Sequence, residues 1–231
     1  VVLRDINPKK QVTFYPFISS SFDSIKNQTK AKAGFDIFWR PTTNFQVTSS
    51  INPDFGNVES DDIVVNLTSY ETFYPEKRPF FLEGQEIFVT SPRASRYGGG
   101  QRKTPITLLN TRRIGSPART PDEDGLELSK LEQNQPSELL GAVKVTGQSG
   151  ALRYGILAAF ENETDFNGVV DSEPVTVNQT GRDFSAARLL YEQSNDNGRR
   201  SVGLIATQVS HTDETANTYG IDAHYLSGTG K

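Results

Sequence analysis

Acidic side chains crowd one short stretch of the chain and suggest a cation site. Residues 54–62 contain four carboxylates, on Asp54, Glu59, Asp61 and Asp62. A hard cation such as Ca²⁺ takes about six to eight oxygen ligands, so this cluster is able to supply several of them. The spacing does not match an EF-hand loop. A polar, hydrated loop is the alternative, and the residues alone do not separate it from a calcium site.

A second charged group surrounds three aromatic residues, Tyr74, Phe80 and Phe81. Inside a hollow protein, side chains of both signs can hold an inserted segment to a charged wall, while aromatic rings pack its small core. Two arginines further along the chain are able to pair with the carboxylates. We therefore predict contacts between a plug and a lumen for Glu71, Glu76, Lys77, Arg78, Glu83, Arg112 and Arg113.

Catalysis by these carboxylates is an alternative that the sequence leaves open. Two facing carboxylates hydrolyse glycosides at separations of roughly 5–9.5 Å, but spacing in sequence does not fix that distance. The glycine-rich stretch 98–104 has Arg102 where a phosphate-binding loop needs the glycine before its lysine. We therefore assign no catalytic residue, and we expect the chain not to be an enzyme.

Composition excludes further classes of protein. The chain has 231 residues, no cysteine and a net charge of -4, which argues against disulfides, thiolate metal sites and binding to nucleic acid. No stretch approaches the roughly 18 apolar residues of a membrane helix, so a membrane protein would have to use strands. Because the chain begins with Val1, contains no methionine and shows no signal peptide, we expect it to be a fragment or processed.

Alternation of apolar and polar residues predicts antiparallel strands. Between positions 30 and 40, for example, Ala33, Phe35, Ile37 and Trp39 share one face, and polar residues share the other. A turn signal in the stretch 195–198 joins two such segments. Eight strands are expected, at residues 11–22, 30–40, 45–51, 139–146, 151–160, 184–193, 201–210 and 219–225. Alternation alone does not distinguish a β-barrel from a soluble β-sandwich such as a carbohydrate-binding module.

The connections between these strands alternate in length. Short turns alternate with longer links, and the longest link is the excursion, which we define as residues 53–136. Short turns on one side and long loops on the other are typical of outer-membrane barrels, with the short turns and both chain ends in the periplasm. An eight-stranded barrel is filled by its own side chains, so an excursion of this size requires a larger barrel.

One segment resembles a known family. The matching residues are Asn52 to Gly56, Val58-Glu59, Asn66-Leu67, Glu71, Phe73, the run Pro75 to Gly84, and Thr111 to Gly115. The chain resembles an uncharacterised bacterial family in which a domain similar to carbohydrate-binding family 9 precedes a C-terminal outer-membrane β-barrel domain of unknown function. The resemblance implies a large outer-membrane barrel and assigns it no activity. The carbohydrate-binding module is absent from this chain.

These observations combine into one prediction. The chain is expected to be all-β: residues 1–231 form part of an antiparallel transmembrane β-barrel in the bacterial outer membrane, and residues 53–136 form a plug-like excursion in its lumen or loops. Its function would be transport, uptake or surface assembly. The expected partners are outer-membrane lipid, a glycan ligand and a periplasmic or surface protein, with Ca²⁺ as the single candidate cofactor. A soluble carbohydrate-binding sandwich and a carboxylate-dependent glycoside hydrolase are the alternatives.

Overall fold

The fold is all-β, as the alternation predicts. The computed structural model describes residues 10–23, 28–54, 74–90 and 107–228. Eight strands form one sheet in the order β1-β2-β3-β5-β6-β9-β10-β11, and each neighbouring pair is antiparallel. Their bounds are β1 Gln11–Asp23, β2 Gln28–Thr42, β3 Phe45–Ile51, β5 Leu139–Ser149, β6 Leu152–Glu161, β9 Asp183–Asn195, β10 Gly198–Ser210 and β11 Thr215–Ser227. All eight predicted strands are confirmed.

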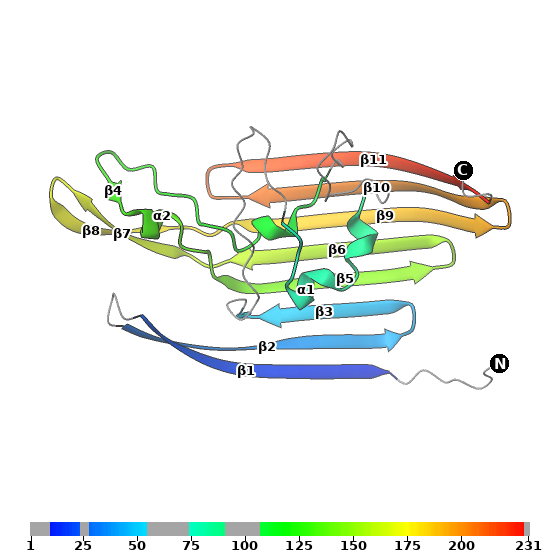
Figure 1. Cartoon of the computed structure of the whole chain (residues 1–231), viewed down its shortest axis with the longest axis horizontal. Coiled ribbons are helices and arrows are strands. Elements are labelled where there is room, and N and C mark those ends of the chain that lie inside the picture. The colour runs from blue at the N-terminus through cyan, green and yellow to red at the C-terminus, as the bar shows by residue number, and fades with distance from the viewer. Residues whose placement is uncertain (1–9, 24–27, 55–73, 91–106, 229–231) are drawn as a thin grey trace.

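Two-residue turns join strands at one end of this sheet, and long connections join them at the other end (Figure 1). The turns are Thr43-Asn44, Gly150-Ala151 and Asp196-Asn197. The excursion leaves β3 and enters β5 at the opposite end of the strands, where β1 joins β2 and β10 joins β11. Strand β1 begins and strand β11 ends at the end of the sheet that carries the short turns.

A second, three-stranded sheet extends from the end of the large sheet that carries the long connections. Strands β7 (Thr164–Val170) and β8 (Glu173–Gln179) form a hairpin, and β4 (Glu127–Leu128) pairs with β7. The short helix α2 (Lys130–Gln133) packs against β7, where Glu132 accepts a hydrogen bond of 3.0 Å from the backbone of Asn167. No strand was predicted between residues 160 and 184, so this hairpin is a correction.

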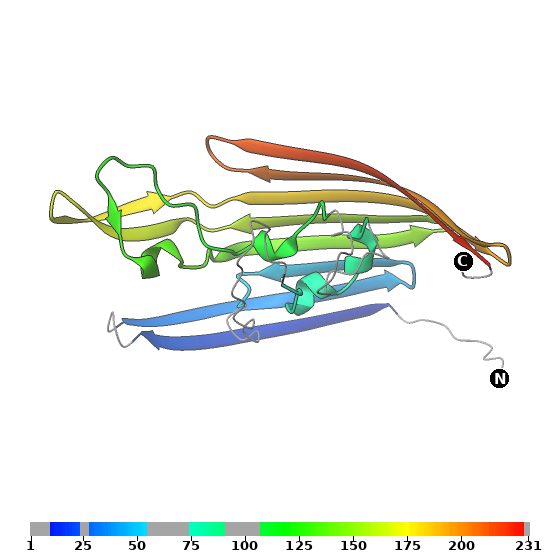
Figure 2. The ribbon, with the colours of Figure 1, turned by 45° about the horizontal axis from the view of Figure 1, so that its top comes forward.

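Residues 74–90 and 107–116 of the excursion lie across one face of the large sheet, whereas its later elements β4 and α2 lie with the three-stranded sheet (Figures 1 and 2). We call this the insert face and the opposite one the open face. The excursion contains helix α1 (Pro79–Leu82) and the 3-10 helices η2 (Gln85–Phe88) and η3 (Thr111–Arg113). No helix in the part of the chain that the structure describes is long and apolar enough to cross a membrane.

The hydrophobic core forms between the excursion and the insert face. Five excursion residues meet small and apolar side chains of β5, β6 and β9, and the cluster consists of Phe80, Phe81, Ile87, Phe88, Ile114, Leu139, Ala142, Leu157, Ala159, Phe184 and Ala186. Gly155 allows the close approach, because a Cβ at that position would lie 2.8 Å from the Phe88 ring. The described part of the excursion is therefore packed on the sheet as a structural layer.

The large sheet is open among the described residues, with β1 and β11 at its two edges. Within the described ranges, no second sheet packs against the open face, because the three-stranded sheet continues beyond the strand ends (Figure 1). Large apolar side chains are exposed there, including Trp39 (43% exposed), Ile156 (55%) and Leu204 (50%). The structure thus bears out an all-β, antiparallel fold.

Candidate functional site

A buried ion pair, Glu76 with Arg78, lies at the centre of the excursion. The Arg78 guanidinium donates from Nε to Glu76 Oε1 at 2.8 Å and from Nη2 to Oε2 at 2.7 Å. The backbone N–H groups of Lys77 and Arg78 also donate to Oε1. The side chains are 1% and 7% exposed. Such a two-pronged, desolvated contact fixes geometry as well as charge.

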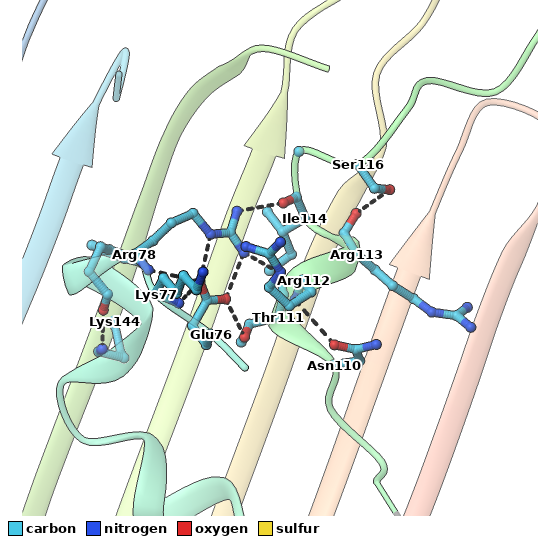
Figure 3. Close-up of polar contacts among 12 residues, drawn as sticks. Glu76, Lys77, Arg78, Asn110, Thr111, Arg112, Arg113, Ile114, Ser116 and Lys144 are labelled. Atoms are coloured by element: carbon cyan, nitrogen blue, oxygen red, sulfur yellow. Dashed lines mark hydrogen bonds and ion pairs between the residues drawn. The ribbon is translucent and has the colours of Figure 1, made fainter. Parts of the chain in front are cut away.

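The same pair fastens a distant part of the excursion. Arg78 donates to the carbonyl oxygens of Thr111 and Ile114, each at 2.7 Å, and the Thr111 hydroxyl donates to Glu76 Oε2 at 2.7 Å (Figure 3). Asn110 caps η3 by accepting from the backbone N–H of Arg112. We call Glu76, Arg78, Thr111 and Ile114 the clasp.

The local sequence explains how Arg78 reaches this position. Pro79 occupies the first turn of α1, where its missing N–H costs nothing, so the chain turns directly after Arg78. The guanidinium carbon then lies 4.2 Å from the centre of the Phe81 ring, a cation–π contact. Phe81 in turn packs edge-on against Phe80. The charged clasp and the aromatic core are thus one packed unit.

Hydrogen bonding determines the protonation of Glu76. Burial by itself raises the pKa of this carboxyl, but hydrogen bonds from Arg78 and Thr111 and the positive charge of Arg78 outweigh burial and lower the pKa below its ordinary value of 4.5. Glu76 is therefore ionised at neutral pH. Because both of its oxygens are occupied, the carboxylate joins two segments and is not presented to a substrate.

Cations of the sheet hold the excursion by its backbone. Lys144 of β5, buried on the insert face, donates to the carbonyl oxygens of Phe80 and Glu83. Arg188 of β9, 1% exposed, donates from Nε to the carbonyl of Ile87 at 3.1 Å. These carbonyls belong to α1, η2 and their ends, where backbone acceptors lack partners within the helix. The sheet therefore satisfies polar groups that the short helices leave open.

Arg188 is itself held by a second ion pair. Its Nη2 donates to Asp222 Oδ1 of β11 at 2.9 Å, and Nη1 donates to Oδ2. The guanidinium crosses β10 at Gly203, where an added Cβ would lie 2.5 Å from Nη2. His224 contacts both Asp222 and the carbonyl of Thr90. Three strands are thereby linked to one end of η2.

A third group of contacts fixes the excursion near the end of β6. Glu161, at the end of β6 and 1% exposed in its side chain, accepts from the backbone of Gly115 at 2.9 Å and from Arg182 Nε at 2.7 Å. Arg182 also donates to the carbonyl of Ser116. The excursion is thus anchored at both ends of its buried layer.

The structure places the predicted contact residues in different surroundings. Glu76 and Arg78 pair with each other within the excursion, and Glu83 pairs with Arg40 of β2 at 3.3 Å. Lys77, Arg112 and Arg113 belong to the same two segments, and Figure 3 shows Arg113 extending away from Glu76. Glu71 lies outside the described residues. That these side chains hold a plug in a lumen stays a prediction.

The calcium prediction is equally untested. Asp54 is described, whereas Glu59, Asp61 and Asp62 fall outside the described residues. Within the described ranges, no group of three or more His, Asp or Glu side chains is arranged to hold a metal ion.

The residues that anchor the excursion from outside it were not predicted from the sequence; they are Lys144, Glu161, Arg182, Arg188 and Asp222. A signal was present for two of them: Lys144 follows Ala142 and Arg188 follows Ala186 at the strand spacing of two. A long cation next to a small residue on one strand face indicates a place where another segment approaches. The identity of that segment could not be read from the strands.

A family comparison agrees with this picture of one continuous unit. Residues 8–227 match the family described as a domain of unknown function, DUF5916. The chain belongs to this family. No curated protein and no solved structure matches it. The match spans the eight-stranded sheet and the excursion together, so both are parts of the DUF5916 domain.

Proposed function

We propose that this DUF5916 chain forms part of a transmembrane β-barrel in the bacterial outer membrane, with the excursion folded into its lumen, and that it acts in transport or uptake. One observation carries the proposal: the open face of the large sheet is apolar along its strands, while charged side chains gather on the insert face. In a barrel wall, apolar side chains meet lipid and polar ones meet the lumen.

Cross-strand pairing makes this division of the faces continuous. Leu189, Leu204 and Ile221 pair directly at the middle of β9, β10 and β11 and share the open face. A neighbouring row on the same face consists of Val12, Trp39, Val47, Val145, Ile156, Ala187, Ala206 and Tyr219. Along β9 to β11, charged residues lie on the insert face except Asp183 and Arg200, which are near strand ends.

Strand length and connection length support the same proposal. Strands β9, β10 and β11 each have 13 residues, which span about 43 Å at roughly 3.3 Å per residue. Tilted by about 45°, they would cover the hydrocarbon thickness of about 30 Å. The two-residue turns would then be periplasmic and the excursion would enter the lumen from the outside. It would act as a folded-in loop that narrows the passage.

The alternatives have less support. A β-sandwich would bury Phe35, Ile37 and Trp39 under a second sheet, and the described residues place none there. A glycoside hydrolase would present two carboxylates in an open cleft. Glu76 is buried with Arg78, and Glu83 pairs with Arg40.

A charge on the open face distinguishes a membrane wall from a soluble sheet. We expect Leu189→Arg in the full-length protein to abolish or strongly reduce assembly into the outer membrane, because a cation at mid-bilayer costs about 2–4 kcal/mol. On a soluble sheet, the same change at a 48% exposed position would cost within about 0.5 kcal/mol. Leu131→Arg, at a 59% exposed position of α2 outside the large sheet, is the matched control.

The measurement is membrane fractionation combined with heat-modifiable migration on gels. The unaltered protein and Leu131→Arg should fractionate with the outer membrane and migrate differently after boiling. A protein that stays soluble without detergent, or a Leu189→Arg variant that assembles like the control, would refute the proposal.

A further inference from the structure

The excursion covers the insert face unevenly. Its buried contacts come from β5, β6, β9 and β11 and from the β6 to β9 connection, through Lys144, Glu161, Arg182, Arg188 and His224. Among the described residues, the polar contact between the excursion and β2 is the Arg40–Glu83 pair, whose side chains are 49% and 36% exposed. The described part of the excursion therefore leaves the insert face of β1 and β2 accessible, and Tyr15 on that face is 56% exposed.

A hollow of about 300 Å³ lies at this accessible part. It is lined on the insert face by Gln11, Thr13, Tyr15, Phe38, Arg40, Gln46 and Glu83, and also by Trp39, which belongs to the open-face row of β2. The size lies at the small end of the range for ligand pockets. One wall is formed by strands β1 to β3, and the other by Glu83 at the end of α1. Both the sheet and the excursion thus contribute to it.

Its charges compensate each other. Arg40 Nη2 lies 3.3 Å from Glu83 Oε1 and donates to Gln46 Oε1 at 2.6 Å. The Gln46 amide in turn donates to Thr48 at 3.2 Å. An ionic ligand would have to break this pair or leave its own charge without a partner. The lining therefore favours a ligand that is polar and neutral.

Aromatic rings supply the rest of the lining. The rings of Tyr15 and Phe38 are 5.7 Å apart and nearly perpendicular, so they present surfaces in two directions. Tyr15 combines an apolar ring with a hydroxyl group, and Thr13 and Gln11 add further hydrogen-bonding groups. Ring faces next to amides and hydroxyls match molecules whose C–H faces are apolar and whose edges carry many hydroxyls.

We propose that this hollow binds a neutral saccharide. The inference rests on the proposed function for its location, because the insert face would line the lumen of the barrel. Tyr15 and Phe38 contact the sugar face, while Arg40, Gln46 and Glu83, already held in one network, accept or donate hydrogen bonds to its hydroxyls. The excursion thereby forms one wall of a binding site in the lumen.

Saturation-transfer NMR on the purified full-length protein tests this site. The probes are maltotriose, cellotriose and N,N′,N″-triacetylchitotriose, with trigalacturonate and chitosan trimer as charged counterparts of similar size. We expect transfer to at least one neutral trisaccharide, and Tyr15→Leu or Phe38→Leu to weaken its binding about tenfold. Tyr219→Leu, which removes a 77% exposed ring from the open face, should leave binding unchanged.

Three results would overturn the proposal: no transfer to any of the neutral trisaccharides, equal binding by Tyr15→Leu and the unaltered protein, or stronger binding of a charged trimer. Membrane assembly is measured separately by fractionation. A protein that assembles but binds no saccharide refutes the hollow alone. A soluble protein that binds saccharide through Tyr15 refutes the barrel and keeps the site.

Discussion

Removing Arg78 should release the excursion from its buried layer. In Arg78→Met, the Glu76 carboxylate loses its cation and the carbonyls of Thr111 and Ile114 each lose a donor. Stranding one member of a buried ion pair costs about 3–5 kcal/mol. At about 1.4 kcal/mol per factor of ten, this corresponds to a rise of roughly 140-fold to 3,700-fold in the population of the locally opened excursion.

Hydrogen exchange measures that opening residue by residue. The backbone N–H groups of Phe81 and Leu82, bonded to the carbonyl of Arg78, and of Ile114, bonded to that of Thr111, report on the clasp. Their exchange should accelerate by the factor given above, while amides in β9 and β10 keep their protection.

Two control variants test whether the buried ion pair causes the effect. Arg119→Met removes a cation whose 3.2 Å pair with Glu214 is exposed, so it should change exchange by less than about threefold. In a Glu76→Gln background, Arg78→Met should cost less, because no charge is then stranded. An acceleration below about tenfold in the single variant, or strict additivity in the double variant, would contradict the buried-pair account.

Two further predictions concern the same layer. Because the pKa of Glu76 is lowered in the folded state, the stability that its ionised form contributes is complete above the ordinary pKa of 4.5 and is lost as the pH falls through the lower, folded value. The protection factor of the Ile114 amide, which is corrected for the slower intrinsic exchange in acid, should therefore fall as the pH is lowered, and Glu76→Gln should remove that fall. A fall that persists in Glu76→Gln would contradict its assignment to Glu76. Gly155→Ala should destabilise the packed excursion by about 1–3 kcal/mol in thermal unfolding, because the new Cβ meets the Phe88 ring. An unaltered melting temperature would show that the Phe88 ring moves aside without a cost in stability.

The strands of the large sheet were predictable because their information is local. Alternation places Phe35, Ile37 and Trp39 on one face whatever surrounds them, and a turn with Asn197-Gly198 closes a hairpin without help from distant residues. The hairpin at residues 164–179 was missed because its strands have seven residues each and one contains Pro174. Its Asp171-Ser172 turn has positive φ at both positions, which non-glycine residues seldom adopt.

The candidate site was predictable in part, because charge and aromatic character mark the segment 71–83 as unusual for a loop. The partners of those charges were not predictable, because Arg78 binds carbonyl oxygens of Thr111 and Ile114, and every residue has such an oxygen.

By itself, the sequence determined the fold class, the eight strands and the division of each strand into an apolar and a polar face, since these follow from the period of two. Tertiary structure alone decided which face receives the excursion and where Arg188 finds Asp222 across Gly203. The physical reason is that alternation sets the direction of a side chain, whereas its contacts depend on which distant segment is packed within a few ångströms of it.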